Sequence, residues 1–171
     1  MAIIFELVVN FGENVEGARA AALTDPSPLT LQAGSRRIPL HRAHLNSSGS
    51  HVELSVVPVA VSWGLPMDGT IPKARLSAAE LTDLGNGLYG LLAKFNGYVA
   101  AKVGWDPEAF LDPEELKTDS TDRLADDTIH GLVLCEALHH ELGLGDNYVE
   151  FQPGYLWIPY RGEKPSTLTA G

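Results

Sequence analysis

The sequence has a single cysteine, Cys135, among its 171 residues. One thiol excludes an intramolecular disulfide and is typical of proteins in reducing compartments. Long apolar runs are missing too, because none approaches the roughly 20 residues that a membrane span needs. The apolar start, Met1–Phe5, lacks a basic segment and is interrupted by Glu6 and Asn10, which argues against a signal peptide. We therefore expect a soluble, cytoplasmic protein without a membrane partner.

Basic residues are few. The chain has 12 Lys and Arg against 22 Asp and Glu, a formal net charge of −10. Such a surface repels phosphate backbones, so nucleic acid is not expected as a partner. The nearest basic stretch, Arg36-Arg37 with Arg42, is short and lacks interleaved aromatic residues. An apolar content of 44% and a charged content of 20% are typical of a globular chain rather than a disordered one.

Several stretches have the patterns of β-strands. Residues 2–11 alternate, with Ile3, Phe5 and Leu7 on the same face, which predicts a strand with one fully buried face. A β segment is also expected over 52–63, with a bulge or break next to Pro58. Two hairpins are expected, one joining 29–32 to 37–40 and one joining 148–151 to 155–158.

One long helix dominates the rest of the chain. Ser77 and Glu80 form a capping box, and apolar residues recur every three or four positions after it. This stripe predicts a helix over 78–103. Shorter helices are expected at 15–23, after Asp106, after Asp112 and at 136–142, with a mobile link at 118–121.

Together these patterns predict an α+β fold. It consists of a mostly antiparallel sheet of about five to seven short strands, with the long helix 78–103 packed on it. We expect one domain over residues 1–160 and a flexible C-terminal tail over 161–171.

A literal GxGxxG motif occurs at Gly85-Asn86-Gly87-Leu88-Tyr89-Gly90. In dinucleotide-binding folds such glycines form the turn between a strand and a helix. Here no strand precedes the motif, which lies inside the helical stripe. We interpret these glycines as close helix packing or a kink, not as a nucleotide site.

One cluster of residues has metal-ligating side chains. Glu136 and His140 lie four residues apart on one face of a predicted helix, and Gly143 permits a turn that returns Asp146 beneath it. From His140 on, the stretch resembles the second half of the zinc signature of metzincins and related zincins. The first half departs from the pattern, because Glu136 and Ala137 stand where it has histidine and the catalytic glutamate.

This partial resemblance covers about a dozen residues. It implies a zinc hydrolase in which Glu136, His140 and Asp146 hold the ion and a zinc-bound water attacks the substrate. Glu141 or another carboxylate would then have to replace the missing general base. The competing interpretation is a solvated helix end with a glycine cap.

The last hairpin carries aromatic residues that form a candidate interaction surface. Tyr155, Trp157 and Tyr160 would make an apolar patch for a partner protein or for self-association if they point outward. The alternative is that the hairpin contributes them to the core.

The sequence shows no complete catalytic constellation and no cofactor motif, so no catalytic or cofactor-binding residue is assigned. We therefore expect a non-enzymatic intracellular module that binds a partner protein or assembles as a homo-oligomer. The alternative is the zinc hydrolase that uses Glu136, His140 and Asp146.

Overall fold

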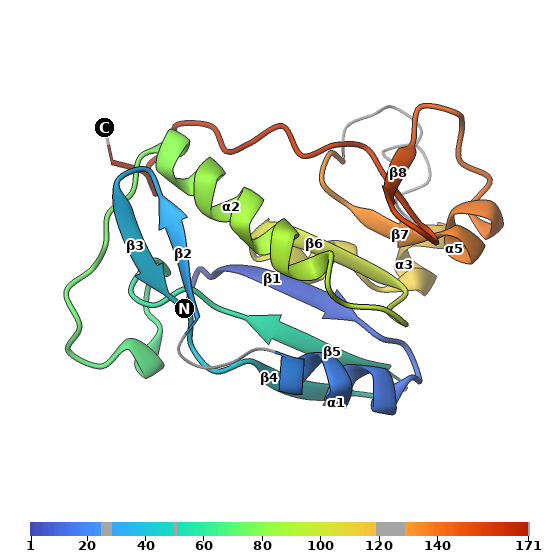
Figure 1. Ribbon diagram of the computed structural model, residues 1–171, viewed down its shortest axis with the longest axis horizontal. Coiled ribbons are helices and arrows are strands. Elements are labelled where there is room, and N and C mark those ends of the chain that lie inside the picture. Colours follow the sequence, from blue (N-terminus) through green and yellow to red (C-terminus); the bar gives the residue numbers. More distant parts are fainter. Residues whose placement is uncertain (25–28, 50, 119–128, 171) are drawn as a thin grey trace.

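The computed structural model describes residues 1–24, 29–49, 51–118 and 129–170. Over these residues the predicted α+β fold is confirmed, with a seven-stranded sheet and a separate two-stranded hairpin (Figure 1). The predicted link at 118–121 falls mostly outside the described residues. No described helix has the length and apolar character that crossing a membrane requires.

The strands are β1 (Phe5–Asn10), β2 (Thr30–Ala33), β3 (Arg36–Pro39), β4 (His44–Ser48), β5 (His51–Val56), β6 (Ala100–Trp105), β7 (Val133–Cys135), β8 (Val149–Gln152) and β9 (Tyr155–Trp157). The α-helices are α1 (Val15–Thr24), α2 (Ala78–Leu92), α3 (Pro113–Thr118) and α5 (Glu136–Glu141), with 3₁₀ turns η1 (Pro66–Asp68) and η2 (Pro107–Phe110). Both predicted hairpins, the helix after Asn14 and the turns after Asp106 and Asp112 are therefore present.

The large sheet has the order β4-β5-β1-β6-β7-β9-β8, and each neighbouring pair is antiparallel. Helices α1 and α2 contribute to a core on one face of the sheet, whereas α3 and α5 contribute to a core on the other. Strand β1 lies between β5 and β6, and the two cores cover both of its faces, so it is buried on both, where the alternation predicted only one. Its polar residues Glu6 and Asn10 are therefore buried.

The predicted helix over 78–103 was too long. Helix α2 ends at Leu92, and residues 100–105 form β6 instead. The apolar stripe continues to Phe95, which is buried, but Gly97 then adopts a φ of +81°. The N–H of Val99 donates to Asn10 O at 2.7 Å, which begins the pairing with β1. Strand pairing and a positive-φ glycine thus override a helical spacing that β-branched valines support only weakly.

The capping box at the start of α2 is confirmed. Ser77 Oγ accepts the N–H of Glu80, and Glu80 Oε2 accepts the N–H of Ser77 at 2.8 Å.

The packing interpretation of the glycine motif also agrees with the structure. A Cβ on Gly85 would lie 2.6 Å from the hydroxyl oxygen of Tyr160, and one on Gly87 would lie 3.2 Å from Leu31.

The C-terminal segment lies along α2 where the sequence predicted a free tail (Figure 1). The N–H of Glu163 donates to Thr82 Oγ1 at 2.9 Å, and the N–H of Ala170 donates to Leu76 O at 2.8 Å. These bonds use backbone groups, so the polar composition of the segment gave no sign of them.

Two glycines of α2 should respond in opposite ways to alanine. Gly85→Ala should lower the free energy of unfolding by about 1–3 kcal/mol, because its Cβ meets Tyr160 and forces repacking. Gly90→Ala should raise it by up to about 1 kcal/mol, because nothing lies within 4 Å of its Cβ and alanine favours helix. Urea denaturation of both variants measures this contrast, and equal effects would contradict the packing role of Gly85.

Candidate functional site

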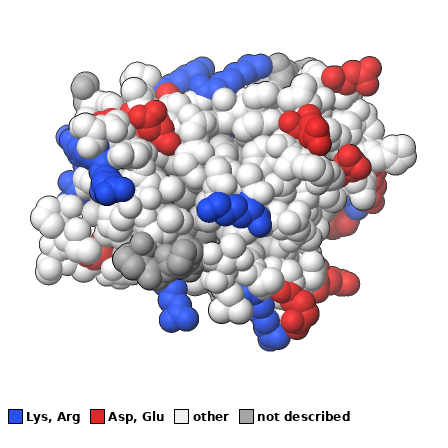
Figure 2. Space-filling model, in the orientation of Figure 1, with Lys and Arg blue, Asp and Glu red and all other residues white. Residues whose placement is uncertain are grey.

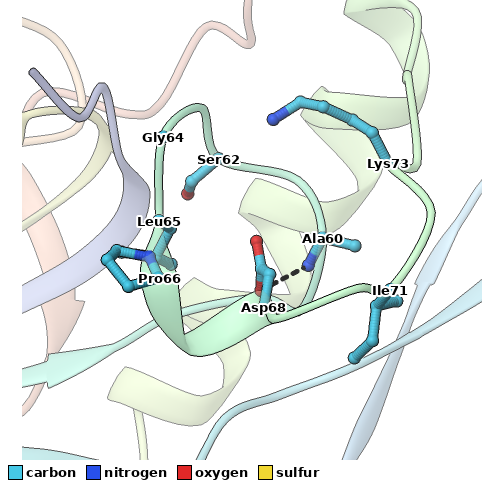
Figure 3. A pocket seen from close by; sticks show the side chains of 8 residues that line it. All are labelled: Ala60, Ser62, Gly64, Leu65, Pro66, Asp68, Ile71 and Lys73. Carbon is cyan, nitrogen blue, oxygen red and sulfur yellow. Dashed lines mark hydrogen bonds between the residues drawn. The ribbon is translucent and has the colours of Figure 1, made fainter.

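A cavity of about 280 Å³ opens in the long loop between β5 and α2. We call it the loop pocket. It is lined by Ala60, Ser62, Gly64, Leu65, Pro66, Asp68, Ile71 and Lys73 (Figure 3). Its volume is close to the lower limit of the range usual for small-molecule sites. The cavity is therefore large enough for one small polar group with a short apolar stem.

The loop forms because strand pairing stops at a proline. Strand β5 ends at Val56, which confirms the break predicted next to Pro58, but the β segment predicted to continue to residue 63 does not resume as a strand. Pro66 then begins the turn η1. Gly64 and Gly69 provide positive φ angles of 69° and 58°. The N–H of Ala74 donates to Ala60 O at 2.8 Å and closes the loop across its base.

Asp68 is the best-anchored polar residue of the pocket. Its Oδ1 lies 2.6 Å from Nε2 of His41 and accepts the N–H of Ala60 at 2.9 Å. The side chains of His41 and Asp68 are only 14% and 12% exposed. Ala60 has a φ of 61°, which is rare for a residue with a side chain. Strain of this kind concentrates at functional sites, so it makes the loop pocket a candidate for one.

Lys73 provides the opposite charge. Its amine lies 4.0 Å from the centroid of the Trp63 ring, within cation–π range. Partial burial lowers the pKa of this amine, and the negative charge of Asp68 acts in the opposite direction. The hydroxyl oxygen of Ser62 accepts the N–H of Phe5 at 3.0 Å and lies at the cavity wall. The loop pocket therefore combines a carboxylate, an ammonium group and a hydroxyl.

The same loop also exposes apolar side chains. Met67 and Ile71, on the same loop, are 46% and 52% exposed although both are large and apolar. Arg36 and Arg75 lie beside the loop and are exposed, and Arg36 Nη1 donates to Arg75 O at 3.3 Å. In Figure 2, Lys and Arg side chains occur at this end of the molecule together with Asp and Glu, and acidic side chains are most frequent toward the opposite end. Arg36 is also paired with Glu80, with 3.6 Å between Nε and Oε1, so Lys73 is the basic side chain that lines the cavity.

The three predicted metal ligands do not form a comparable cluster. Helix α5 and the positive φ of Gly143 occur as expected, and Glu136, His140 and Asp146 are all exposed. Within the described ranges, no three His, Cys, Asp or Glu side chains come together as a group that could hold a metal ion. The structure thus does not bring the three predicted ligands together.

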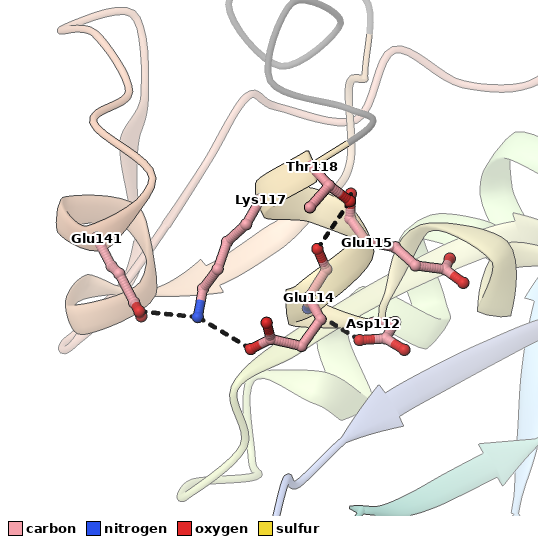
Figure 4. Close-up of polar contacts among 6 residues, drawn as sticks. All are labelled: Asp112, Glu114, Glu115, Lys117, Thr118 and Glu141. Carbon is pink, nitrogen blue, oxygen red and sulfur yellow. Dashed lines mark hydrogen bonds and ion pairs between the residues drawn. The ribbon is translucent and has the colours of Figure 1, made fainter.

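Glu141, the substitute base in the zinc interpretation, has a structural partner. Its Oε1 lies 2.8 Å from Nζ of Lys117, which also lies 3.2 Å from Oε1 of Glu114 (Figure 4). Hydrogen bonds to these two carboxylates raise the pKa of the Lys117 amine. This network joins α5 to α3. Neighbouring His139 packs edge-on against Tyr148, with ring centroids 4.9 Å apart.

The aromatic residues of the last hairpin are mostly turned inward. Tyr155 is buried and stacks on Tyr98, with ring centroids 4.0 Å apart. Trp157 and Tyr160 are partly buried and pack against Tyr89. The structure therefore places the predicted interaction surface largely within the core, as the alternative interpretation proposed.

Sequence reasoning missed the loop pocket. Its lining residues all come from the loop, within 60–73, but His41, the partner that fixes Asp68, follows β3. No spacing pattern connects them. The available signal was the loop itself, where the apolar residues Leu65, Met67 and Ile71 occur among prolines and glycines.

Comparison with protein-family models, with curated proteins and with solved structures finds no match to this chain. The functional argument therefore rests on the geometry of the molecule.

Proposed function

We propose that the protein is a non-enzymatic binding module that holds a segment of a partner protein at the loop pocket. The observation that carries this proposal is the fixed carboxylate of Asp68, which lines a cavity together with exposed Ile71, on a loop that also exposes Met67. A few fixed polar groups in a cavity that is otherwise lined by apolar residues are the usual anatomy of a ligand site.

The setting that we propose is the cytoplasm, where the one cysteine, partly buried Cys135, would stay reduced. Self-association remains a further proposal. Its support is the predominance of acidic side chains toward one end of the molecule, which basic side chains of a second copy could meet (Figure 2). Sedimentation velocity at low and high salt tests it, and a monomer under both conditions would count against it. No observation on the described residues favours the zinc hydrolase.

The binding proposal predicts a specific loss of affinity. Peptides selected from a random displayed library against the whole chain should bind the Met67→Ser/Ile71→Ser variant about tenfold or more weakly. Each half-exposed apolar side chain that a ligand covers contributes on the order of 1 kcal/mol. Fluorescence polarisation with labelled peptides measures the change.

The matched control is Leu45→Ser/Val149→Ser, which removes two apolar side chains of similar exposure, 39% and 48%, from strands β4 and β8. This variant should retain the affinity of the wild-type protein. If the control lost as much affinity as the loop variant, or if neither lost any, the loop would not be the binding surface.

A further inference from the structure

The loop pocket contains two opposite charges with a cavity between them. Asp68 uses one carboxylate oxygen, Oδ1, for both His41 and Ala60. Figure 3 shows its other oxygen directed into the cavity, toward the side that carries Ser62. A carboxylate oxygen only accepts hydrogen bonds, so this oxygen suits a donor, and a cationic donor gains most.

Lys73 lies on the other side of the same cavity, and its amine extends toward the loop segment that carries Ser62 and Gly64 (Figure 3). An ammonium group donates and cannot accept, so it suits an anionic group of the ligand. Exposed Arg75, two residues farther along the loop, adds positive charge nearby, whereas Arg36 is paired with Glu80.

We infer that the loop pocket binds a zwitterionic group, with the ligand's ammonium on Asp68 and its carboxylate on Lys73. A cavity of about 280 Å³ has room for one amino-acid residue rather than a long segment. Two sources share this chemistry: a free amino acid, and the first residue of a partner chain when that residue is acidic. This inference rests on the proposed function in taking the loop pocket as the binding site, and it names the group that is recognised.

The carboxylate of Asp68 is held in a fixed position, which favours binding of a small ligand. Two hydrogen bonds fix Asp68 before any ligand arrives, and one of them comes from the strained Ala60. A group that is fixed in advance loses little conformational entropy on binding, which favours affinity for a small ligand. His41 belongs to this arrangement as a positioning residue, because it contacts Asp68 and does not line the cavity.

The test uses four probes with the whole chain, in calorimetric titrations. The tripeptide amide Glu-Ala-Leu-NH₂ carries both charges. Its N-acetylated form lacks the ammonium, and Gln-Ala-Leu-NH₂ lacks the side-chain carboxylate. Free L-alanine is a zwitterion without a peptide chain. We expect the first peptide to bind about tenfold or more tightly than either singly charged form, because each of those forms lacks one of the two charge-assisted bonds.

Two variants assign each charge to its residue. Asp68→Asn should abolish the preference for the free amine over the acetylated form, and Lys73→Met should abolish the preference for Glu over Gln. Because Asp68 also supports the loop, circular dichroism must show that Asp68→Asn is folded. Lys73 is exposed at the rim, so its variant tests the inference independently.

Each outcome decides something. Preferences that persist in the variants, or no binding of either L-alanine or the zwitterionic peptide, would overturn the inference. Binding of L-alanine without the peptide would support the zwitterionic site but overturn the proposed partner-binding function. Equal binding of the three peptides would support the proposed partner-binding function but overturn the zwitterionic site.

Discussion

The Glu6→Gln variant should be more stable than the wild-type protein by about 3 kcal/mol above pH 7, and equally stable below pH 4.5. Burial raises the pKa of Glu6 from 4.5 to about 7, with Glu108, Asp106 and Glu53 adding repulsion and a hydrogen bond from Ser55 opposing it. Its side chain lies on the central strand β1, and the residue is 6% exposed. One unit of pKa shift corresponds to about 1.4 kcal/mol.

The sign follows from the number of protons bound in each state. Between pH 4.5 and about 7 the folded chain retains a proton on Glu6 that the unfolded chain has lost. The free energy of unfolding of the wild type therefore falls as the pH rises through this window. Glutamine resembles the protonated acid and does not titrate, so it removes this dependence.

Urea denaturation at a series of pH values measures the difference between the two proteins. Glu13→Gln, in the exposed turn after β1, is the control, and it should change stability by no more than about 0.5 kcal/mol at any pH. A Glu6→Gln difference that stays constant across the window would show that the buried carboxyl does not titrate as described.

The second large effect is expected at Tyr155. Its hydroxyl accepts the N–H groups of Gly97 and Tyr98 at 2.9 and 3.1 Å and donates to Tyr98 O at 3.1 Å. Tyr155→Phe keeps the ring but leaves these backbone groups without their partner. A buried donor without a partner costs about 1–3 kcal/mol, so the variant should lose about 2–4 kcal/mol of stability.

Tyr98→Phe is the matched control, because the two rings stack on each other. The Tyr98 hydroxyl receives one bond, from Gln152 Nε2, and that nitrogen also donates to Phe95 O at 2.8 Å. This variant should therefore lose about 1 kcal/mol or less. Thermal unfolding of both variants makes the comparison, and an equal loss would show that the Tyr155 hydroxyl does not organise the turn before β6.

Local signals in the sequence predicted local structure well. The capping box at Ser77, the break at Pro58 and the glycine after α5 each act on their own residues or near neighbours, and each occurs as expected. The end of α2 was predicted wrongly because a distant strand, β1, decides it. The spacing of Val99 and Val103 satisfied a helix and a strand alike, and only the pairing with β1 distinguishes the two.

The candidate site depends even more on distant contacts. His41 and Asp68 are 27 positions apart and become neighbours only because strand β3 and the loop fold together. The sequence instead drew attention to the His140 region, where a short motif resembles half of a zinc signature. Side chains that share a motif need not converge, and in the described structure these do not.

The central claim is that the loop pocket is the binding site, and a map of the bound ligand tests it most directly. Two-dimensional NMR of the isotope-labelled chain, titrated with a library-selected peptide, would locate the contacts. We predict that the largest shifts of backbone amide signals fall on Ala60, Ser62, Asp68 and Lys73. Shifts concentrated instead around His140 and Asp146, or along the exposed face of α2, would contradict the account.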